Sequence, residues 1–332
     1  MKISRTNSNK YTYNTKIEIF NKHLVKDTCS DVGLDYSMFD FSNDAITHLI
    51  ETYTNETGVR GLKRKLEKLM NKINLEKLYG KHESLNAQNK KIITPQIIDQ
   101  YLEKPSLYPK KIFPTSEVGI INGLYASNTG PGGILPILIY RHITGGNKFK
   151  LKLTGQQKSV MKESIIFSFT IATNLIKNTY IEEFLKLYPK GLHIHTPDGS
   201  TPKDGPSAGC AFTTAFVSRI LNKKIKNNIA MTGEIETNGN VTAIGGLECK
   251  LLGAKKAGVN LVLVPQENEP DFNKIIKKNK TLIDDEFRVI IVNNILDILE
   301  YALIDDKIID KLKTKNITYE KTFNCSEYII NN

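Results

Sequence analysis

The sequence predicts an α+β chain in which a small all-helical domain is followed by a larger mixed α/β domain. Helical periodicity dominates residues 13–104, and strand-like apolar runs alternate with helical segments across residues 117–304. Three prolines interrupt the segment between them, KPSLYPKKIFPTS. We therefore expect a linker at 105–116, a disordered or extraneous N-terminus at 1–12 and a polar C-terminal tail at 305–332.

The first domain carries the start signals and the apolar stripes of helices. Ser42 is a favourable N-cap for the segment DAITHLIETY, and Gly58 ends its periodicity. Thr94 followed by Pro95 predicts the start of a short helix, IIDQYL. Between them, one helix places its apolar side chains along a single stripe, at Leu62, Leu66, Leu69 and Ile73. We expect this domain to consist of helices alone.

The second domain begins with three β-rich runs separated by glycine-containing turns, at 117–125, 132–140 and 147–155. A long helix is predicted for residues 157–177. Strands are then expected at 191–196, 228–235, 260–265 and 287–292, and helices at 208–221, 247–258, 270–278 and 295–303. This alternation predicts a mixed α/β core.

Composition is that of a globular protein, with 40% hydrophobic and 24% charged residues. No apolar run reaches the ~18 residues that span a bilayer, and the polar start MKISRTNSNK lacks the apolar middle of a secretory signal. The four cysteines lie far apart, which predicts neither a zinc site nor a disulfide framework: Cys29, Cys210, Cys249 and Cys325. We expect an intracellular protein, in the cytoplasm or an organelle matrix, without a membrane span or a bound metal.

The net charge of +11 suggests an anionic partner, and residues 274–280 (KIIKKNK) form the densest basic run. The basic residues are nevertheless spread through the whole chain and lack interleaved aromatic side chains. Specific nucleic acid binding is therefore not expected.

The segment TPKDGPSAG, residues 201–209, predicts a stiff turn that delivers Ser207 to the start of an apolar helix. Free backbone N–H groups at a helix start can hold an oxyanion, and small neighbours let a substrate backbone approach. A lone G-x-S-x-G, here residues 205–209, is more often only a turn with a helix cap. A second component is needed to identify a nucleophile.

Lys250 is that second component, because it lies at the edge of an apolar helix face in GGLECKLLGAKKAG, beside Leu247, Leu251 and Ala254. Lost hydration can lower a lysine pKa from about 10.4 toward about 7 to 8, where the neutral amine accepts a serine proton. The alternative is a lysine that extends along the helix edge to solvent. Spacing alone leaves both open.

Three motifs, TPKDGPSAG, MTGEI and IGGLECKLLGAKKAG, closely resemble the proteolytic domain of Lon proteases. The resemblance covers nearly the whole chain, from about residue 13 to 304. It implies that Ser207 is the nucleophile, that Lys250 is its general base and that Thr232 hydrogen-bonds within the serine-lysine dyad.

The resemblance also implies supporting roles near the site. Asp204 matches an aspartate that switches the site between closed and open forms, and a buried carboxylate there could pair with the Lys250 ammonium. His193 and His195 match a histidine pair near the site, and their alternation on one strand leaves a metal or a Cys210–histidine dyad conceivable. We disfavour the cysteine alternative because Cys210 lies a turn inside the predicted helix.

The stretch ETYTNETGVRGLKRKLEKL resembles the lid of the Lon ATPase module, and Arg60 matches its nucleotide-sensing arginine. An exposed arginine in a turn between helices is the alternative. The 332 residues contain no G-x-x-x-x-G-K-[ST] phosphate loop, so ATP with magnesium is expected to act only through a large ATPase domain absent from this sequence, and peptide-bond chemistry needs no cofactor.

Two departures concern the surroundings of the site. The family often has a tryptophan in the loop after the first protease strand, whereas this chain reads GLYASNTGPGGIL, and Cys249 replaces a charged residue beside the base. The resemblance implies a hexameric ring that degrades unfolded proteins in quality control. The alternatives are a non-catalytic subunit assembling with full-length Lon rings or a separate ATPase part, and the carboxy-terminal part of a longer polypeptide.

Overall fold

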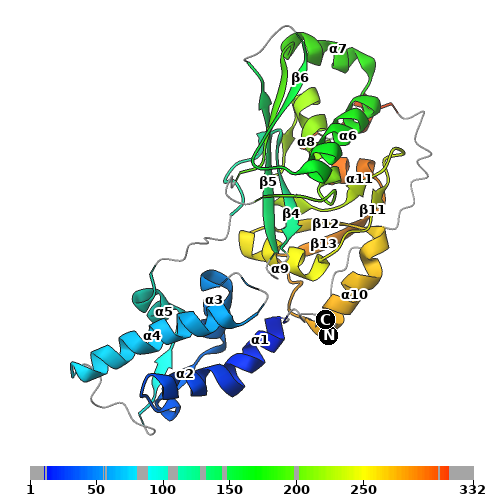
Figure 1. Ribbon diagram of the computed structural model, residues 1–332. Helices are drawn as coiled ribbons and strands as arrows, with labels where there is room; N and C mark the ends of the chain where they lie inside the picture. Colours follow the sequence, from blue (N-terminus) through cyan, green and yellow to red (C-terminus); the bar gives the residue numbers. More distant parts are fainter. Residues whose placement is uncertain are drawn as a thin grey trace, which may run out of the picture. The chain divides into compact units, whose positions relative to one another are not determined.

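The structure is a computed structural model that describes residues 11, 13–54, 56, 58–80, 89–103, 111–127, 132–143, 148–197, 202–305 and 307–313 (Figure 1). The chain divides into two compact units, one of residues 1–109 with 127–131 and one of residues 110–126 with 132–332. Several expectations lie outside the described residues, namely those for 1–10, for linker residues 105–110, for the loop tip 128–131, for Cys325 and for the tail beyond 313.

The first unit is a cluster of helices: α1 (Tyr13–Ile19), a π-helical turn (Phe20–Leu24), α2 (Val25–Asp31), α3 (Asn43–Tyr53), α4 (Arg60–Leu78) and α5 (Pro95–Tyr101). The Ser42 hydroxyl accepts a hydrogen bond from Ala45 N at 3.1 Å, as its N-cap position predicts. The predicted stripe on α4 is fully buried in the core of this unit: Leu62, Leu66, Leu69 and Ile73.

This unit also contains a short parallel strand pair, β1 (Phe39–Phe41) with β2 (Lys91–Ile93), preceded by a 3-10 turn at Tyr36–Met38. The expectation of helices alone is corrected on this point. Paired residues, such as Phe39 and Lys91, are 52 positions apart in sequence, so no local pattern predicts the pairing. The predominantly helical character is confirmed.

The second unit is built on a seven-stranded mixed sheet in the order β13-β12-β9-β4-β5-β7-β6. Its strands are β4 (Ile120–Ala126), β5 (Gly132–Arg141), β6 (Lys150–Thr154), β7 (Gly191–His195), β9 (Ile229–Met231), β12 (Leu261–Pro265) and β13 (Arg288–Val292). Strand β5 pairs antiparallel with β4 and β7, whereas β9 pairs parallel with β4 and β12. Two-stranded pairs lie beside it: β3 (Glu117–Val118) with β8 (Lys224–Ile225), and β10 (Glu234–Ile235) with β11 (Val241–Thr242).

Helices cover both faces of this sheet (Figure 1). One core involves α6 (Ser159–Leu175), α7 (Asn178–Leu187), α8 (Gly209–Leu221) and α11 (Ile295–Ala302), and the other involves α9 (Leu247–Ala257) and α10 (Glu269–Lys278). Alternating residues of β12 and β13 enter the two cores in turn, which requires apolar residues throughout these strands. The predicted mixed α/β class is confirmed.

Several details of this unit differ from the expectations. Helix α7 and the short strands β8 and β11 were not predicted, and the strand expected at 117–125 is divided into β3 and β4. The strand expected at 228–235 ends at Met231, and its last two residues form β10. The interruption falls on Thr232 and Gly233, which make contacts with the segment before α8. Among the described helices, none is long and apolar enough to cross a bilayer.

Candidate active site

Ser207 lies in the turn immediately before α8, a helix whose residues are almost all buried. Its backbone is held from the segment that interrupts the strand β9: Gly233 N donates to Ser207 O at 2.8 Å, and Thr232 Oγ1 donates to the same oxygen at 3.0 Å. Gly205 has φ +102°, a conformation that side chains disfavour. Two donors from one segment, at Thr232 and Gly233, thus fix the position of the Ser207 backbone.

The turn at residues 155–158 anchors the segment that leads to Ser207. Lys203 N donates to Gln156 O at 3.0 Å, and Lys158 N donates to Lys203 O at 2.9 Å. Gly155 has φ +105°, and a Cβ there would lie 2.0 Å from Thr196 O. Sequence reasoning missed this anchor, although the glycine directly after the β6 run was an available signal.

Asp204 differs from its expectation. It is exposed, and its carboxylate accepts a hydrogen bond from Met161 N in the first turn of α6 at 3.2 Å. A carboxylate at a helix start is stabilised by the unpaired N–H groups there. Across the described residues, no hydrogen bond or ion pair joins Asp204 to Lys250, so the suggested buried pair is not observed.

Lys250 enters the site from α9 and is only 2% exposed. Its Nζ donates to Thr232 Oγ1 at 3.0 Å, and Thr232 is itself completely buried. A threonine hydroxyl can accept one hydrogen bond and donate another, so Thr232 connects the Lys250 amine to the Ser207 backbone. The solvent-exposed alternative for Lys250 does not apply in this structure.

Burial lowers the pKa of Lys250 from 10.5 to about 8, because the buried ammonium ion loses its hydration, and the neighbouring Cys210 opposes this only partly. With a pKa of about 8, roughly a tenth of the amine is neutral at pH 7. Within the described part of the chain, no hydrogen bond connects the Lys250 and Ser207 side chains directly. The site therefore contains a proton-accepting amine that the Thr232 hydroxyl connects to the backbone of Ser207.

His193 and His195 project from β7 and share the hydroxyl of Thr154 on the neighbouring strand, with ring nitrogens 2.8 and 2.7 Å from Thr154 Oγ1. Burial, with help from Lys152, lowers the pKa of His193. No hydrogen bond among the described residues links either histidine to Ser207. The described residues also contain no group of three His, Cys, Asp or Glu side chains that could hold a metal ion.

The two cysteines nearest the site are poor nucleophiles. Cys210 is completely buried on α8, and burial raises the pKa of its thiol to about 12. The pKa of the half-buried Cys249 thiol is raised as well, mainly by burial. Because the thiolate is the reactive form, these environments disfavour the cysteine alternative.

Arg60, the sequence-predicted nucleotide-sensing residue, belongs to the other unit. It is exposed at the first residue of α4. The start of this helix is capped by Glu56, whose carboxylate accepts from Gly61 N at 2.8 Å and Leu62 N at 2.7 Å. Sequence reasoning did not predict this cap, since Glu56 lies four residues before the helix.

Comparisons with known proteins find relatives for both parts of the chain. Residues 92–305 match the family described as Lon protease (S16) C-terminal proteolytic domain, and residues 30–86 match the Lon protease AAA+ ATPase lid domain. A Lon protease homolog of Acanthamoeba polyphaga mimivirus is 39% identical over 87% of this chain and 33% of its own length. The Lon protease of Clostridium acetobutylicum is 36% identical over 89% of this chain and 36% of its own length.

The mitochondrial Lon protease homolog of Drosophila melanogaster is 32% identical over 89% of this chain and 28% of its own length. The chain thus spans about a third of the length of the curated relatives it matches. The matched portion contains the lid and the proteolytic domain with Ser207, Thr232 and Lys250. On these grounds the chain belongs to the Lon protease family.

Proposed function

We propose that this chain is a serine endopeptidase in which Ser207 is the nucleophile and Lys250 the general base. The observation that carries this proposal is the buried Lys250 amine, which has a pKa lowered to about 8 and lies 3.0 Å from Thr232 Oγ1. A desolvated amine of this kind can accept a proton near neutral pH, which a solvated lysine cannot do efficiently. Membership of the Lon family supports the same reaction class.

In the proposed reaction, Ser207 Oγ attacks the scissile carbonyl carbon while neutral Lys250 accepts the hydroxyl proton. The Lys250 ammonium then returns this proton to the leaving amine as the peptide C–N bond breaks and an acyl-enzyme remains. Water then gives a proton to the neutral amine and attacks the ester carbonyl carbon. The bond from this carbon to Ser207 Oγ breaks, and the Lys250 ammonium returns the proton to the serine oxygen. The first step requires the Ser207 hydroxyl to come within about 3 Å of Nζ, where a hydrogen bond joins the two groups.

Backbone N–H groups before α8 are suited to hold the developing oxyanion. Among the described residues, the N–H groups of Ser207 and Ala208 donate no hydrogen bond. Small residues, Gly205 and Gly209, lie close by in sequence. Donors at a helix start stabilise negative charge on a tetrahedral intermediate.

We also propose that the complete assembly is a hexameric ring, that it couples proteolysis to ATP hydrolysis, and that its substrates are unfolded proteins. The lid match supports these proposals, because a lid is part of an ATPase module. Arg60 would sense nucleotide there, and ATP with magnesium would be held through a large ATPase domain. His193, His195 and Asp204 would support the geometry around the nucleophile. The protein would act in the cytoplasm or in an organelle matrix.

Hydrolysis of a fluorogenic peptide and of an unfolded protein by wild type and Ser207→Ala tests the proposal. We expect the variant to lose at least about 10³-fold in kcat, because no acyl-enzyme can form. Cys210→Ala is the matched control and should retain activity, since its thiol stays protonated. Mass mapping after labelling with a serine-reactive inhibitor should find the modification on Ser207.

The second candidate is a non-catalytic subunit that assembles with full-length Lon rings or with a separate ATPase part. It is favoured by the position of the Lys250 amine, which among the described residues is hydrogen-bonded to Thr232 and not to Ser207. Equal, negligible rates for wild type and Ser207→Ala, alone and mixed with a full-length Lon, would support this candidate and contradict the peptidase.

A further inference from the structure

The beginning of β5 and the helix α9 approach each other with backbone against backbone. A Cβ added at Gly132, the first residue of β5, would lie 2.2 Å from Cys249 O. From the other side, a Cβ added at Gly253 would lie 2.4 Å from the carbonyl carbon and oxygen of Gly132. All of these atoms belong to the main chain, so no side chain could rotate to make room.

The next glycine of the strand does not share this contact. A Cβ added at Gly133 would meet the ring of Tyr125 at 2.9 Å, and this ring is the far end of a side chain that is 42% exposed. Successive strand residues face opposite sides of a sheet, which accounts for the difference. Of these two neighbours, only Gly132 has its missing side chain directed at the main chain of α9.

The contact lies directly beside the proposed base, because Cys249 precedes Lys250 on α9. Lys250 N donates to Gly246 O at 3.1 Å, so the turn that carries the amine is a regular part of the helix start. A helix moves as a unit, because its hydrogen bonds resist local distortion. A shift of α9 at Cys249 therefore moves Lys250 with it.

We propose that Gly132 is a positioning residue for Lys250: without a side chain at this point, α9 can lie close enough to β5 for the lysine amine to reach Thr232 and the serine beyond it. This inference rests on the proposed serine-lysine chemistry for its effect on activity. Its structural part, the seat of α9, can be measured without any activity.

A Cβ at Gly132 would lie 2.2 Å from Cys249 O, so an ordinary nonbonded separation of about 3.5 Å in a Gly132→Ala variant requires a displacement of at least about 1.3 Å. A misplacement of about 1 Å can reduce a reaction rate roughly 100-fold. The displacement also opens a path for water to the amine, which favours the ammonium form. Gly132 is the end residue of β5, so this movement can occur without loss of the sheet.

The experiment compares Gly132→Ala and Gly253→Ala with two controls. Gly133→Ala introduces the same methyl group one residue along the strand, and Gly245→Ala introduces it just before α9, where nothing lies within 4 Å. Peptide hydrolysis is measured from pH 6 to about 10, and the Lys250 amine is titrated by NMR in protein labelled with 15N-lysine. Circular dichroism and thermal unfolding report the fold.

We expect Gly132→Ala and Gly253→Ala to fold and to lose roughly 100-fold in kcat. The pKa of Lys250 should rise in both, and the acid limb of the pH–rate profile should move to higher pH with it. Both controls should resemble wild type. An unchanged pKa and rate in Gly132→Ala would overturn the inference, as would equal effects of Gly133→Ala. Loss of fold in both clashing variants would overturn the inference too, because the close contact would then be needed for stability of the fold and not for the position of the Lys250 amine.

A wild-type protein without peptidase activity would contradict the proposed function only. In that case a Lys250 pKa displaced upward in Gly132→Ala, and unchanged in Gly133→Ala, would still support the positioning role.

Discussion

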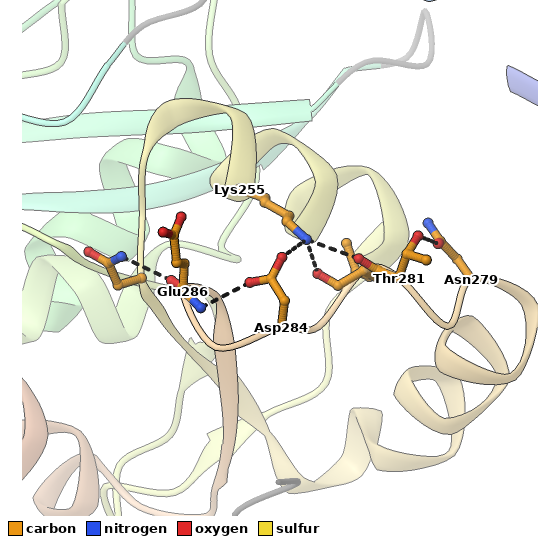
Figure 2. A network of polar contacts seen from close by, with 7 residues as sticks. Lys255, Asn279, Thr281, Asp284 and Glu286 are labelled. Atoms are coloured by element: carbon orange, nitrogen blue, oxygen red, sulfur yellow. Dashed lines mark hydrogen bonds and ion pairs between the residues drawn. The ribbon is translucent and has the colours of Figure 1, made fainter. Parts of the chain in front are cut away.

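Two lysines on the same helix, Lys250 and Lys255, have opposite environments. Lys250 is buried against Thr232, a neutral hydroxyl, whereas Lys255 Nζ forms an ion pair with Asp284 at 2.6 Å. Lys255 also donates to the carbonyl oxygens of Thr281 at 3.0 Å and Leu282 at 2.6 Å (Figure 2). Five residues along an α-helix correspond to a rotation of about 140°, so the two side chains leave α9 on different sides.

The groups around a lysine, and not the helix that carries it, therefore determine what replaces the hydration of its amine. A carboxylate and two carbonyl oxygens replace the hydration of the Lys255 ammonium, and its Nζ also lies 5.7 Å from the centre of the Phe287 ring. In return, Lys255 lowers the pKa of Asp284 through a hydrogen bond and its charge. Lys250 has no such anionic partner among the described residues, so burial lowers its pKa.

Replacement of Lys250 should affect catalysis most strongly. Lys250→Met should reduce peptide hydrolysis roughly 10³-fold, because the site loses its only proposed proton acceptor. Lys255→Met removes the same charge from the same helix and should stay within about threefold of wild type, since the network in Figure 2 does not include Ser207. Steady-state rates at saturating peptide measure both variants. A similar loss in the two would show that the buried position of Lys250 gives it no special role in catalysis.

The second effect concerns stability and pH. Below about pH 8, both folded and unfolded states hold the Lys250 proton, so the folded protein bears the full cost of a buried ammonium. Between about pH 8 and 10.5 the unfolded state binds the extra proton, and the cost disappears as pH rises. The stability advantage of Lys250→Met over wild type should therefore shrink by about 3 kcal/mol across this range.

Urea unfolding of wild type and Lys250→Met at a series of pH values measures this change. Subtracting the unfolding free energy of one protein from that of the other at each pH cancels the contribution of the titratable groups that both share. A stability difference independent of pH between about 8 and 10.5 would show that Lys250 titrates alike in both states.

Elements that depend on neighbouring residues could be predicted from the sequence. Local signals were sufficient for the Ser42 cap, for the apolar stripe of α4 and for the helix boundaries around Lys250, because each depends on neighbours a few residues away. The apolar edge of α9 indicated that Lys250 could lose hydration. Its actual depth depends on Thr232, which the sequence places beside it only through the family resemblance.

Contacts between distant segments had no comparable signal. The partners of Lys255 come from residues 281–284, and the cap that Asp204 provides joins a loop to a helix 43 residues earlier. The same holds for the pairing of β1 with β2 and for the close approach of Gly132 to α9. Such contacts follow from the tertiary arrangement, in which long-range packing overrides local preference.

Changes in the network around Lys255 should have modest consequences. Its side chain is 31% exposed and the ion pair lies near the surface, so solvent screens most of the charge interaction. Lys255→Met should lower the unfolding free energy by about 1 kcal/mol, mainly because the carbonyl oxygens of Thr281 and Leu282 lose a donor. Asp284→Asn keeps these two bonds and should have the smaller effect of the two. Urea unfolding at low and high salt measures both, and an Asp284→Asn loss that exceeds the Lys255→Met loss would show that the ion pair, and not the carbonyl contacts, holds this end of α9.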